Sequence, residues 1–168
     1  AATTSGRSLA RPRTNRGVPT TRPYSVKLRR PIEPSTASDG PLDAVALGTP
    51  HFGLGEFEAL VRLFDGRKVK EGLPMLVSTS RGVREMARAR GWIAALETSG
   101  VEVPVDVCTY HSPRVRGLKG RVMTNAAKWA YYAPGMLGVE VSFGSLKECV
   151  ESAIRGAVWR DPQLWTNA

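Results

Sequence analysis

Cysteine is scarce in this sequence, and long apolar runs are missing from it. Among the 168 residues there are two cysteines, Cys108 and Cys149, which are too few for a disulfide framework. Neither belongs to a C-x-x-C pair, so a self-contained zinc ribbon is excluded. No apolar run reaches the length that a transmembrane helix needs, so we expect no membrane partner. The length and the 42% of apolar residues suit one ordinary domain with a sizeable core.

Acidic residues are rare in residues 1–40, which hold eight Lys or Arg side chains and two acids. This segment therefore carries +6 of the net charge of +9, and it contains five prolines and few large apolar residues. Such a segment cannot bury enough surface to offset its ordering entropy, so we expect a disordered or irregular basic arm. It is interpreted as a solvated tail or linker, a targeting peptide, a phosphate-binding arm or a segment foreign to the domain. Its one aromatic residue, Tyr24, argues against base stacking and so against nucleic acid as a partner.

Residues 41–160 alternate apolar segments of two kinds. Short apolar runs predict strands at 44–47, 75–77, 101–105, 121–123 and 137–143, and helical spacing predicts helices at 57–64 and 83–96. Another helix is expected to pass through Trp129 and to stop near Pro134-Gly135. This alternation predicts a three-layer α/β domain, with a mainly parallel sheet and helices on both faces. Residues 161–168 are interpreted as a C-terminal tail.

The helix after residue 145 has the clearest pattern. Ser145 and Glu148 form an S-x-x-E capping box, which satisfies free N–H groups at a helix start. Apolar residues then recur on one helical face: Leu146, Cys149, Val150, Ala153, Ile154, Ala157 and Val158. Because Cys149 belongs to this stripe, we interpret it as a small buried hydrophobic residue.

Polar side chains follow four of the predicted strands, at the point where each strand ends. They are His51, then Ser80 and Arg81, then Cys108, and finally Thr124, Asn125 and Lys128. The carboxyl ends of parallel strands meet at one edge of a sheet, and ligands of open α/β sheets bind beyond that edge. Helix N-termini, a guanidinium and an ammonium group all attract negative charge, so we predict a shared site that handles an anion.

Each of these residues also has an ordinary structural explanation. Ser80 and Asn125 suit helix N-caps, and Arg81 suits a solvated first turn. His51 suits a loop position, and Cys108 suits an inert place in the core. Their shared position favours the functional interpretation, because independent structural uses would not select one sheet edge. As a thiolate, the cysteine could ligate iron.

The same segments carry a resemblance to a known family. The stretch from Leu42 to about Arg155 resembles the carboxy-terminal part of the large, catalytic domain of aconitase X proteins. The matching segments are Ala46-Leu47-Gly48-Thr49-Pro50-His51-Phe52, Thr79-Ser80-Arg81, Asp106-Val107-Cys108-Thr109, Thr124-Asn125-Ala126-Ala127-Lys128 with Tyr131-Tyr132-Ala133-Pro134, and Phe143-Gly144-Ser145-Leu146 with Cys149-Val150. Five matches in the same order make this signal specific, whereas a single T-S-R would not.

The resemblance implies a hydro-lyase (a dehydratase) that acts on a small hydroxylated anion such as cis-3-hydroxy-L-proline or mevalonate 5-phosphate. It implies an iron or iron–sulfur centre with Cys108 as a metal ligand, and it makes His51 a catalytic polar contact or proton relay. The substrate-binding residues that it implies are Ser80, Arg81, Thr124, Asn125 and Lys128.

The resemblance also implies partners. In the family a smaller swivelling domain, fused or separate, closes over the site, and the catalytic part is much longer than this chain. We therefore expect the chain to be one part of a catalytic unit and to be inactive alone. Some family members have cysteine where this chain has Thr49, and one thiolate cannot hold an iron–sulfur cluster.

The alternative function is a non-enzymatic fragment or binding protein whose basic arm contacts nucleic acid or another polyanion. A cytoplasmic location is expected, with organelle targeting by the arm left open.

Overall fold

The computed structural model of the chain describes residues 40–109 and 120–164. The predicted basic arm, the segment 110–119 and residues 165–168 lie outside these described residues. In chain order the elements are β1 (Ala44–Leu47), α1 (Leu54–Phe64), β2 (Met75–Val77), α2 (Arg81–Ala89), α3 (Trp92–Thr98), β3 (Val101–Glu102), β4 (Arg121–Thr124), α5 (Ala127–Leu137), β5 (Glu140–Phe143) and α6 (Leu146–Arg155). Within the described part, no helix is long and apolar enough to cross a membrane.

The strands form one five-stranded sheet in the order β3-β2-β1-β4-β5, and every pair of neighbouring strands is parallel. β1 lies at the centre, where Val45 is in register with Met75 of β2 and with Met123 of β4. The four residues of β1 are all fully buried, as the continuous apolar run at 44–47 predicts for a strand covered on both faces. This confirms the parallel sheet that the sequence predicts.

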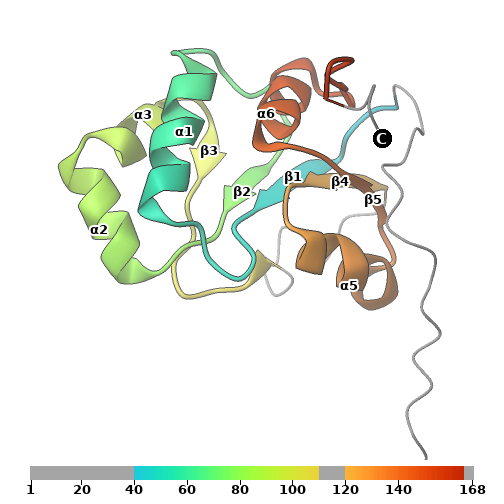
Figure 1. Cartoon of the computed structure of the whole chain (residues 1–168), viewed down its shortest axis with the longest axis horizontal. Coiled ribbons are helices and arrows are strands. Elements are labelled where there is room, and N and C mark those ends of the chain that lie inside the picture. Colours follow the sequence, from blue (N-terminus) through green and yellow to red (C-terminus); the bar gives the residue numbers. More distant parts are fainter. Residues whose placement is uncertain (1–39, 110–119, 165–168) are drawn as a thin grey trace, which may run out of the picture. The chain divides into compact units, whose positions relative to one another are not determined.

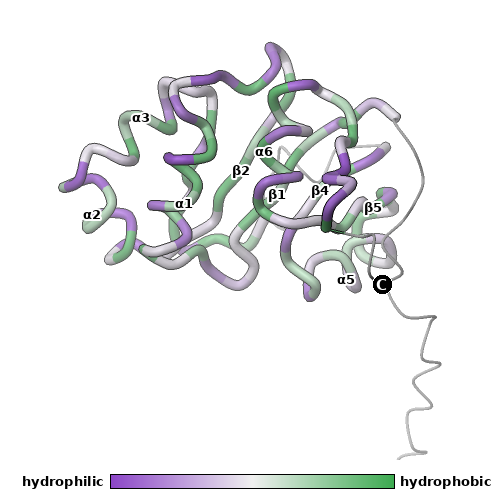
Figure 2. Tube along the Cα trace, turned by 45° about the horizontal axis from the view of Figure 1, so that its top comes forward, coloured by the Kyte–Doolittle hydropathy of each residue, from purple (hydrophilic) through white to green (hydrophobic). Residues whose placement is uncertain are grey.

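Helices cover both faces of the sheet, so the predicted three layers are confirmed (Figure 1). Alternate residues of β1 point into two separate apolar clusters. Val45 and Leu47 belong to a cluster with the inner sides of α1, α3 and α6, whereas Ala44 and Ala46 belong to one with Trp129 of α5. Figure 2 shows β1 and β2 as hydrophobic segments running through the middle of the described chain.

The path of the chain explains why, among the described helices, α5 covers the face opposite to α1, α2 and α3. From β1 to β3 each strand is added on one side, and the connecting helices α1, α2 and α3 cover one face. The chain then returns to place β4 on the other side of β1, and parallel crossovers keep one hand, so α5 covers the opposite face. The strand order therefore reverses between β1 and β4, which is the switch point where doubly wound sheets bind ligands.

Some predicted boundaries are wrong, and backbone chemistry explains them. The helix expected over 83–96 is two helices, because the chain turns at Gly91 with a φ of 76°. Met86 of the first of these two helices is 46% exposed. The strand expected at 101–105 ends after Glu102, because Pro104 has no N–H for the ladder.

The end of α5 also differs from the prediction. The helix passes through Pro134 and ends at Gly138, which adopts a left-handed φ of 69°. Leu137 packs against the apolar cluster beneath α5, so packing carries the helix past the proline. β5 consequently begins at Glu140 rather than at residue 137.

The prediction for α6 is confirmed at its start. Ser145 accepts a hydrogen bond from the backbone N–H of Glu148 at 3.2 Å, and the Glu148 carboxylate accepts one from the N–H of Ser145 at 2.7 Å. Cys149 is fully buried on the predicted stripe. The helix ends at Gly156, so Val158 lies beyond it, although its side chain still packs in the core.

Candidate functional site

A pocket of about 450 Å³ lies at the carboxyl ends of β1 and β4, where the strand order reverses. Three segments supply its walls: the turn after β1, the loop after β3 and the start of α5. The lining residues are Thr49, Pro50, His51, Cys108, Lys128, Tyr132 and Met136. The predicted meeting of strand ends at one edge therefore produces a real hollow at the switch point.

The turn after β1 is shaped by contacts with the end of β2. Gly48 has a φ of 77°, and a Cβ at this position would lie 2.1 Å from the carbonyl oxygen of Ser78, so the close approach requires glycine. The same carbonyl accepts a hydrogen bond from the N–H of Phe52 at 2.8 Å. The hydroxyl of Thr79 donates to the carbonyl of Phe52 at 2.7 Å. These contacts hold the turn that carries His51.

The loop after β3 folds over the same sheet edge. Asp106 adopts a left-handed φ of 54°, and its N–H donates to the carbonyl of Thr79 at 2.9 Å. The hydroxyl of Ser78 donates to the carbonyl of Val107. This path brings Cys108, which is half-buried, against the pocket and against the apolar cluster beneath α5.

The third wall is one side of α5. Lys128, Tyr132 and Met136 are spaced four residues apart, so they lie one above another on the same helical face. Tyr132 and Met136 are each about half exposed, at 48% and 58%. The lysine stands in the first turn of the helix, where the helix dipole also favours an anion.

Three of the seven predicted site residues line this pocket, namely His51, Cys108 and Lys128. The other four lie at the same sheet edge but are not among the lining residues that the structure describes. The sequence analysis did not predict Met136. This residue lies eight positions after Lys128, so the two share a helical face, and that spacing would have indicated it.

Two of these four residues serve the start of α2. Ser80 is the N-cap and accepts a hydrogen bond from the N–H of Val83 at 3.3 Å. Arg81 points its guanidinium to Asp106 at 3.4 Å, with 78% of its side chain exposed.

The other two residues lie between β4 and α5. The buried hydroxyl of Thr124 accepts a hydrogen bond from the N–H of Ala126 at 3.1 Å. Asn125 is half-buried, and the N-cap position that its sequence suggests is taken by Ala126.

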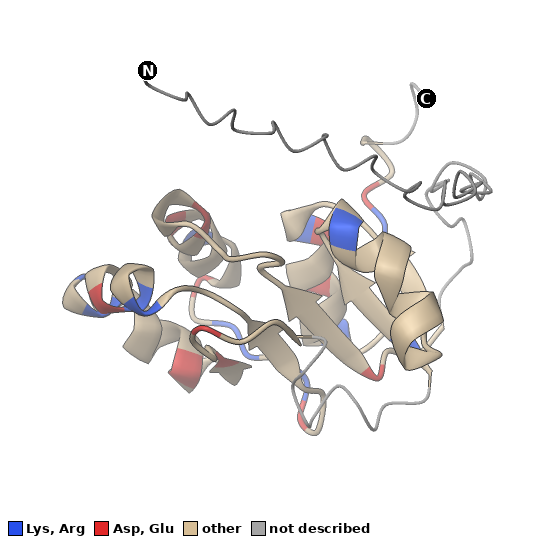
Figure 3. Ribbon diagram, turned by 90° about the horizontal axis from the view of Figure 1, so that it is seen from below, with Lys and Arg blue, Asp and Glu red and all other residues tan. Residues whose placement is uncertain are grey.

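The charge of the pocket favours an anion. Lys128 is its charged lining residue, and no carboxylate stands among the lining residues that the structure describes. Elsewhere on the surface opposite charges are mixed. Figure 3 shows ribbon segments coloured for basic and for acidic residues close together on the same helices. Arg84 of α2 pairs with Glu97 of α3 at 3.2 Å, and Arg88 pairs with Glu85 within α2 at 3.4 Å.

The described residues do not form a complete metal site. No group of three or more His, Cys, Asp or Glu side chains lies together within residues 40–109 and 120–164. Cys108 and His51 line the same pocket, but an iron–sulfur cluster ordinarily takes several cysteine ligands. The second cysteine cannot help, because Cys149 is buried in the core and this burial raises the pKa of its thiol far above the ordinary value.

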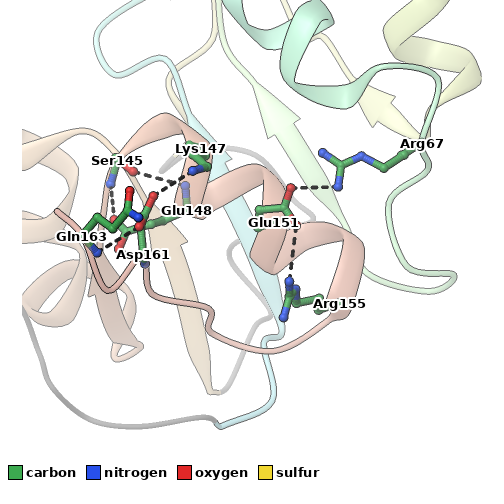
Figure 4. A network of polar contacts seen from close by, with 8 residues as sticks. All are labelled: Arg67, Ser145, Lys147, Glu148, Glu151, Arg155, Asp161 and Gln163. Carbon is green, nitrogen blue, oxygen red and sulfur yellow. Dashed lines mark hydrogen bonds and ion pairs between the residues drawn. The ribbon is translucent and has the colours of Figure 1, made fainter.

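A second polar cluster lies at the start of α6, and we call Ser145, Lys147, Glu148 and Asp161 the α6 cluster (Figure 4). The carboxylate of Glu148 is fully buried and accepts hydrogen bonds from the N–H groups of Ser145 and Asp161, at 2.7 and 3.0 Å. Lys147 donates to Asp161 at 2.8 Å. This hydrogen bond raises the pKa of Lys147 and lowers that of Asp161.

The sheet order and the pocket at its reversal define a doubly wound α/β domain with a ligand site at the switch point. Residues 42–155 match the family model described as the aconitase X third domain, and the chain belongs to the aconitase X family. The match covers every strand and helix of the described part, so the fold is that of the family's third domain.

Named relatives agree with this assignment. The chain is 38% identical over 126 residues to the cis-3-hydroxy-L-proline dehydratase of Pseudomonas aeruginosa, covering 74% of this chain and 22% of that protein. It is 30% identical over 114 residues to the phosphomevalonate dehydratase large subunit of Methanosarcina mazei, covering 68% and 27%. The crystal structure of Thermococcus kodakaraensis aconitase X in its holo-form matches with a TM-score of 0.60 and 26% identity, over 67% of this chain and 28% of that one. The chain thus spans about a quarter of the length of these relatives.

Proposed function

We propose that this chain supplies the third domain of an aconitase X hydro-lyase that removes water from a small hydroxylated anion such as cis-3-hydroxy-L-proline. The observation that carries the proposal is the pocket at the β1/β4 switch point, lined by His51, Cys108 and Lys128. All three residues lie within the stretch that matches the family, and a relative with this activity is 38% identical.

Substrate binding follows from the charge of the pocket. Lys128 places an ammonium group in the first turn of α5, and the helix N-terminus adds partial positive charge beside it. A carboxylate bound there forms a charge-assisted hydrogen bond with the lysine. Tyr132, Met136 and Pro50 supply apolar walls for the carbon skeleton of the substrate.

Elimination of water needs a proton taken from one carbon and a hydroxyl released from its neighbour. His51 lines the pocket, and an imidazole can accept the first proton and return it to the departing hydroxyl, so that water leaves and a double bond forms. We assign His51 this proton transfer or a polar contact beside it.

The iron centre that the family resemblance implies needs donors beyond the described residues. Cys108 offers one sulfur to the pocket, so other parts of the enzyme would have to complete the ligand set. We propose that these parts are the rest of the catalytic domain and the smaller swivelling domain. Because the missing iron ligands and the closing domain would both come from other parts of the enzyme, we expect the chain to be inactive alone.

The remaining substrate contacts stay predictions. Arg81 stands at the same edge, and binding a substrate carboxylate would exchange its present partner, Asp106, for the ligand. The starts of α2 and α5 border the same edge, and near them lie the other predicted contacts: Ser80, Thr124 and Asn125.

A graft tests the proposal. Residues 42–164 replace the matching segment of the Pseudomonas aeruginosa dehydratase, so that the pocket and the α6 cluster enter together. We expect the purified graft to consume cis-3-hydroxy-L-proline, and Cys108→Ala in the graft to abolish this activity. A graft that folds, as judged by thermal unfolding, yet does not dehydrate the substrate would contradict the proposal.

A further inference from the structure

Three residues of the loop after β3 form hydrogen bonds with other segments: Asp106, Val107 and Thr109. Asp106 is held by the backbone of Thr79 at 2.9 Å and by the N–H of Arg81, which donates to its carboxylate at 3.1 Å. Val107 is held through its carbonyl by the hydroxyl of Ser78. These contacts fix the loop to the end of β2 and the start of α2.

Thr109, the third of these residues, is bonded to the turn after β1. The hydroxyl of Thr109, which is fully buried, shares a hydrogen bond of 3.2 Å with the hydroxyl of Thr49. Thr49 lines the pocket together with Pro50 and His51. This hydroxyl pair spans sixty residues of sequence and joins the wall that carries His51 to the wall that carries Cys108.

From these contacts we propose that Thr49 is a positioning residue, which acts through Thr109 to fix Cys108 in the pocket. The neighbours of the cysteine in the loop, Val107 and Thr109, are bonded to two different segments, one to Ser78 after β2 and one to the turn after β1. The side chain between them is therefore held against the pocket and the cluster under α5. The proposal concerns the same pocket as the proposed function and rests on it only for its catalytic consequence.

The experiment measures how fast iodoacetamide modifies the full chain, because its two cysteines differ in a useful way. Cys108 is half-buried at the pocket, whereas Cys149 is fully buried with a raised pKa and does not react while the protein is folded. The modification rate therefore reports Cys108 alone, and Cys108→Ala must reduce it to background.

Thr49→Val removes the hydroxyl with little change of shape. We expect it to raise the modification rate roughly threefold to tenfold, the effect of losing one hydrogen bond that holds the loop closed. Thr49→Ser keeps a hydroxyl and should restore the rate of the unmodified protein. Thr109→Val and the double variant should match Thr49→Val, because both changes break the same contact.

A matched control removes another threonine hydroxyl. Thr98 donates to the carbonyl of Ala94 at 2.8 Å on α3, outside the pocket lining, so Thr98→Val should leave the rate unchanged. An unchanged or lower rate in both Thr49→Val and Thr109→Val would overturn the proposal. So would failure of Thr49→Ser to restore the rate, or an equal increase in Thr98→Val. Modification needs no catalysis, so this result stands apart from the outcome of the graft.

Discussion

The pocket and the α6 cluster both gather polar side chains after strands of one sheet, yet they differ in burial. In the α6 cluster the carboxylate of Glu148 is fully buried, and two backbone N–H groups donate to it. In the pocket, His51 and Lys128 are exposed to solvent. A buried charge must be compensated by the fold itself, whereas an exposed one is also solvated by water.

The two regions also differ in what they join. The α6 cluster links the helix start to Asp161, and the neighbouring Arg160 donates to the carbonyl of Phe143 at 2.5 Å. These bonds fasten the segment after α6 to the end of β5. The pocket instead lies between the turn after β1, the loop after β3 and α5, and these three segments supply its lining residues. The comparison teaches that the buried carboxylate of Glu148 serves the scaffold, whereas His51 and Lys128 stay accessible to solvent at the pocket.

The largest effect that this comparison predicts is on folding. Glu148→Ala should lower the free energy of unfolding by about 3 kcal/mol, because it leaves two N–H groups and the nearby Arg160 without their buried partner. Urea unfolding measures this change. Glu58→Ala is the matched control on the surface of α1, where loss of an exposed pair with Arg62 should cost less than about 1 kcal/mol. Equal losses in the two variants would contradict the contrast.

The scaffold was readable from the sequence where local signals agree. The run 44–47 gave a central strand, because a strand buried on both faces needs apolar residues throughout. The S-x-x-E signal at residue 145 gave the start of α6. In contrast, the passage of α5 through Pro134 depends on the packing of Leu137 against the cluster under that helix, which local patterns do not contain. The break at Gly91 is a backbone turn, which the helical spacing of the flanking apolar residues concealed.

The site was only partly readable for a similar reason. Strand ends brought His51, Cys108 and Lys128 to one pocket, because parallel strands share an edge. The other predicted residues at that edge point into the pocket only if their side chains are not bonded to another residue of the chain. Arg81 pairs with Asp106 and Thr124 bonds the N–H of Ala126, and neither partnership follows from spacing alone. The roles of these residues therefore remain predictions.

A smaller effect concerns the pH dependence of the α6 cluster. The hydrogen bond from Lys147 lowers the pKa of Asp161, so its stabilising contribution is present above the ordinary aspartate value and is lost as the pH falls through the lowered one. Thermal unfolding of Asp161→Asn and of the unmodified protein should therefore differ most at neutral pH and converge below about pH 4. A difference that stays constant down to pH 2 would contradict this account.

The central proposal is that Lys128 at the β1/β4 switch point contacts the substrate and that Lys147 of the α6 cluster does not. Steady-state kinetics of the graft tests it most directly, with two lysines exchanged in turn for methionine. Lys128→Met should raise the KM for cis-3-hydroxy-L-proline about tenfold or more, the value of one charge-assisted hydrogen bond, while Lys147→Met leaves the KM unchanged. An unchanged KM in Lys128→Met, or an equal rise in Lys147→Met, would contradict the account.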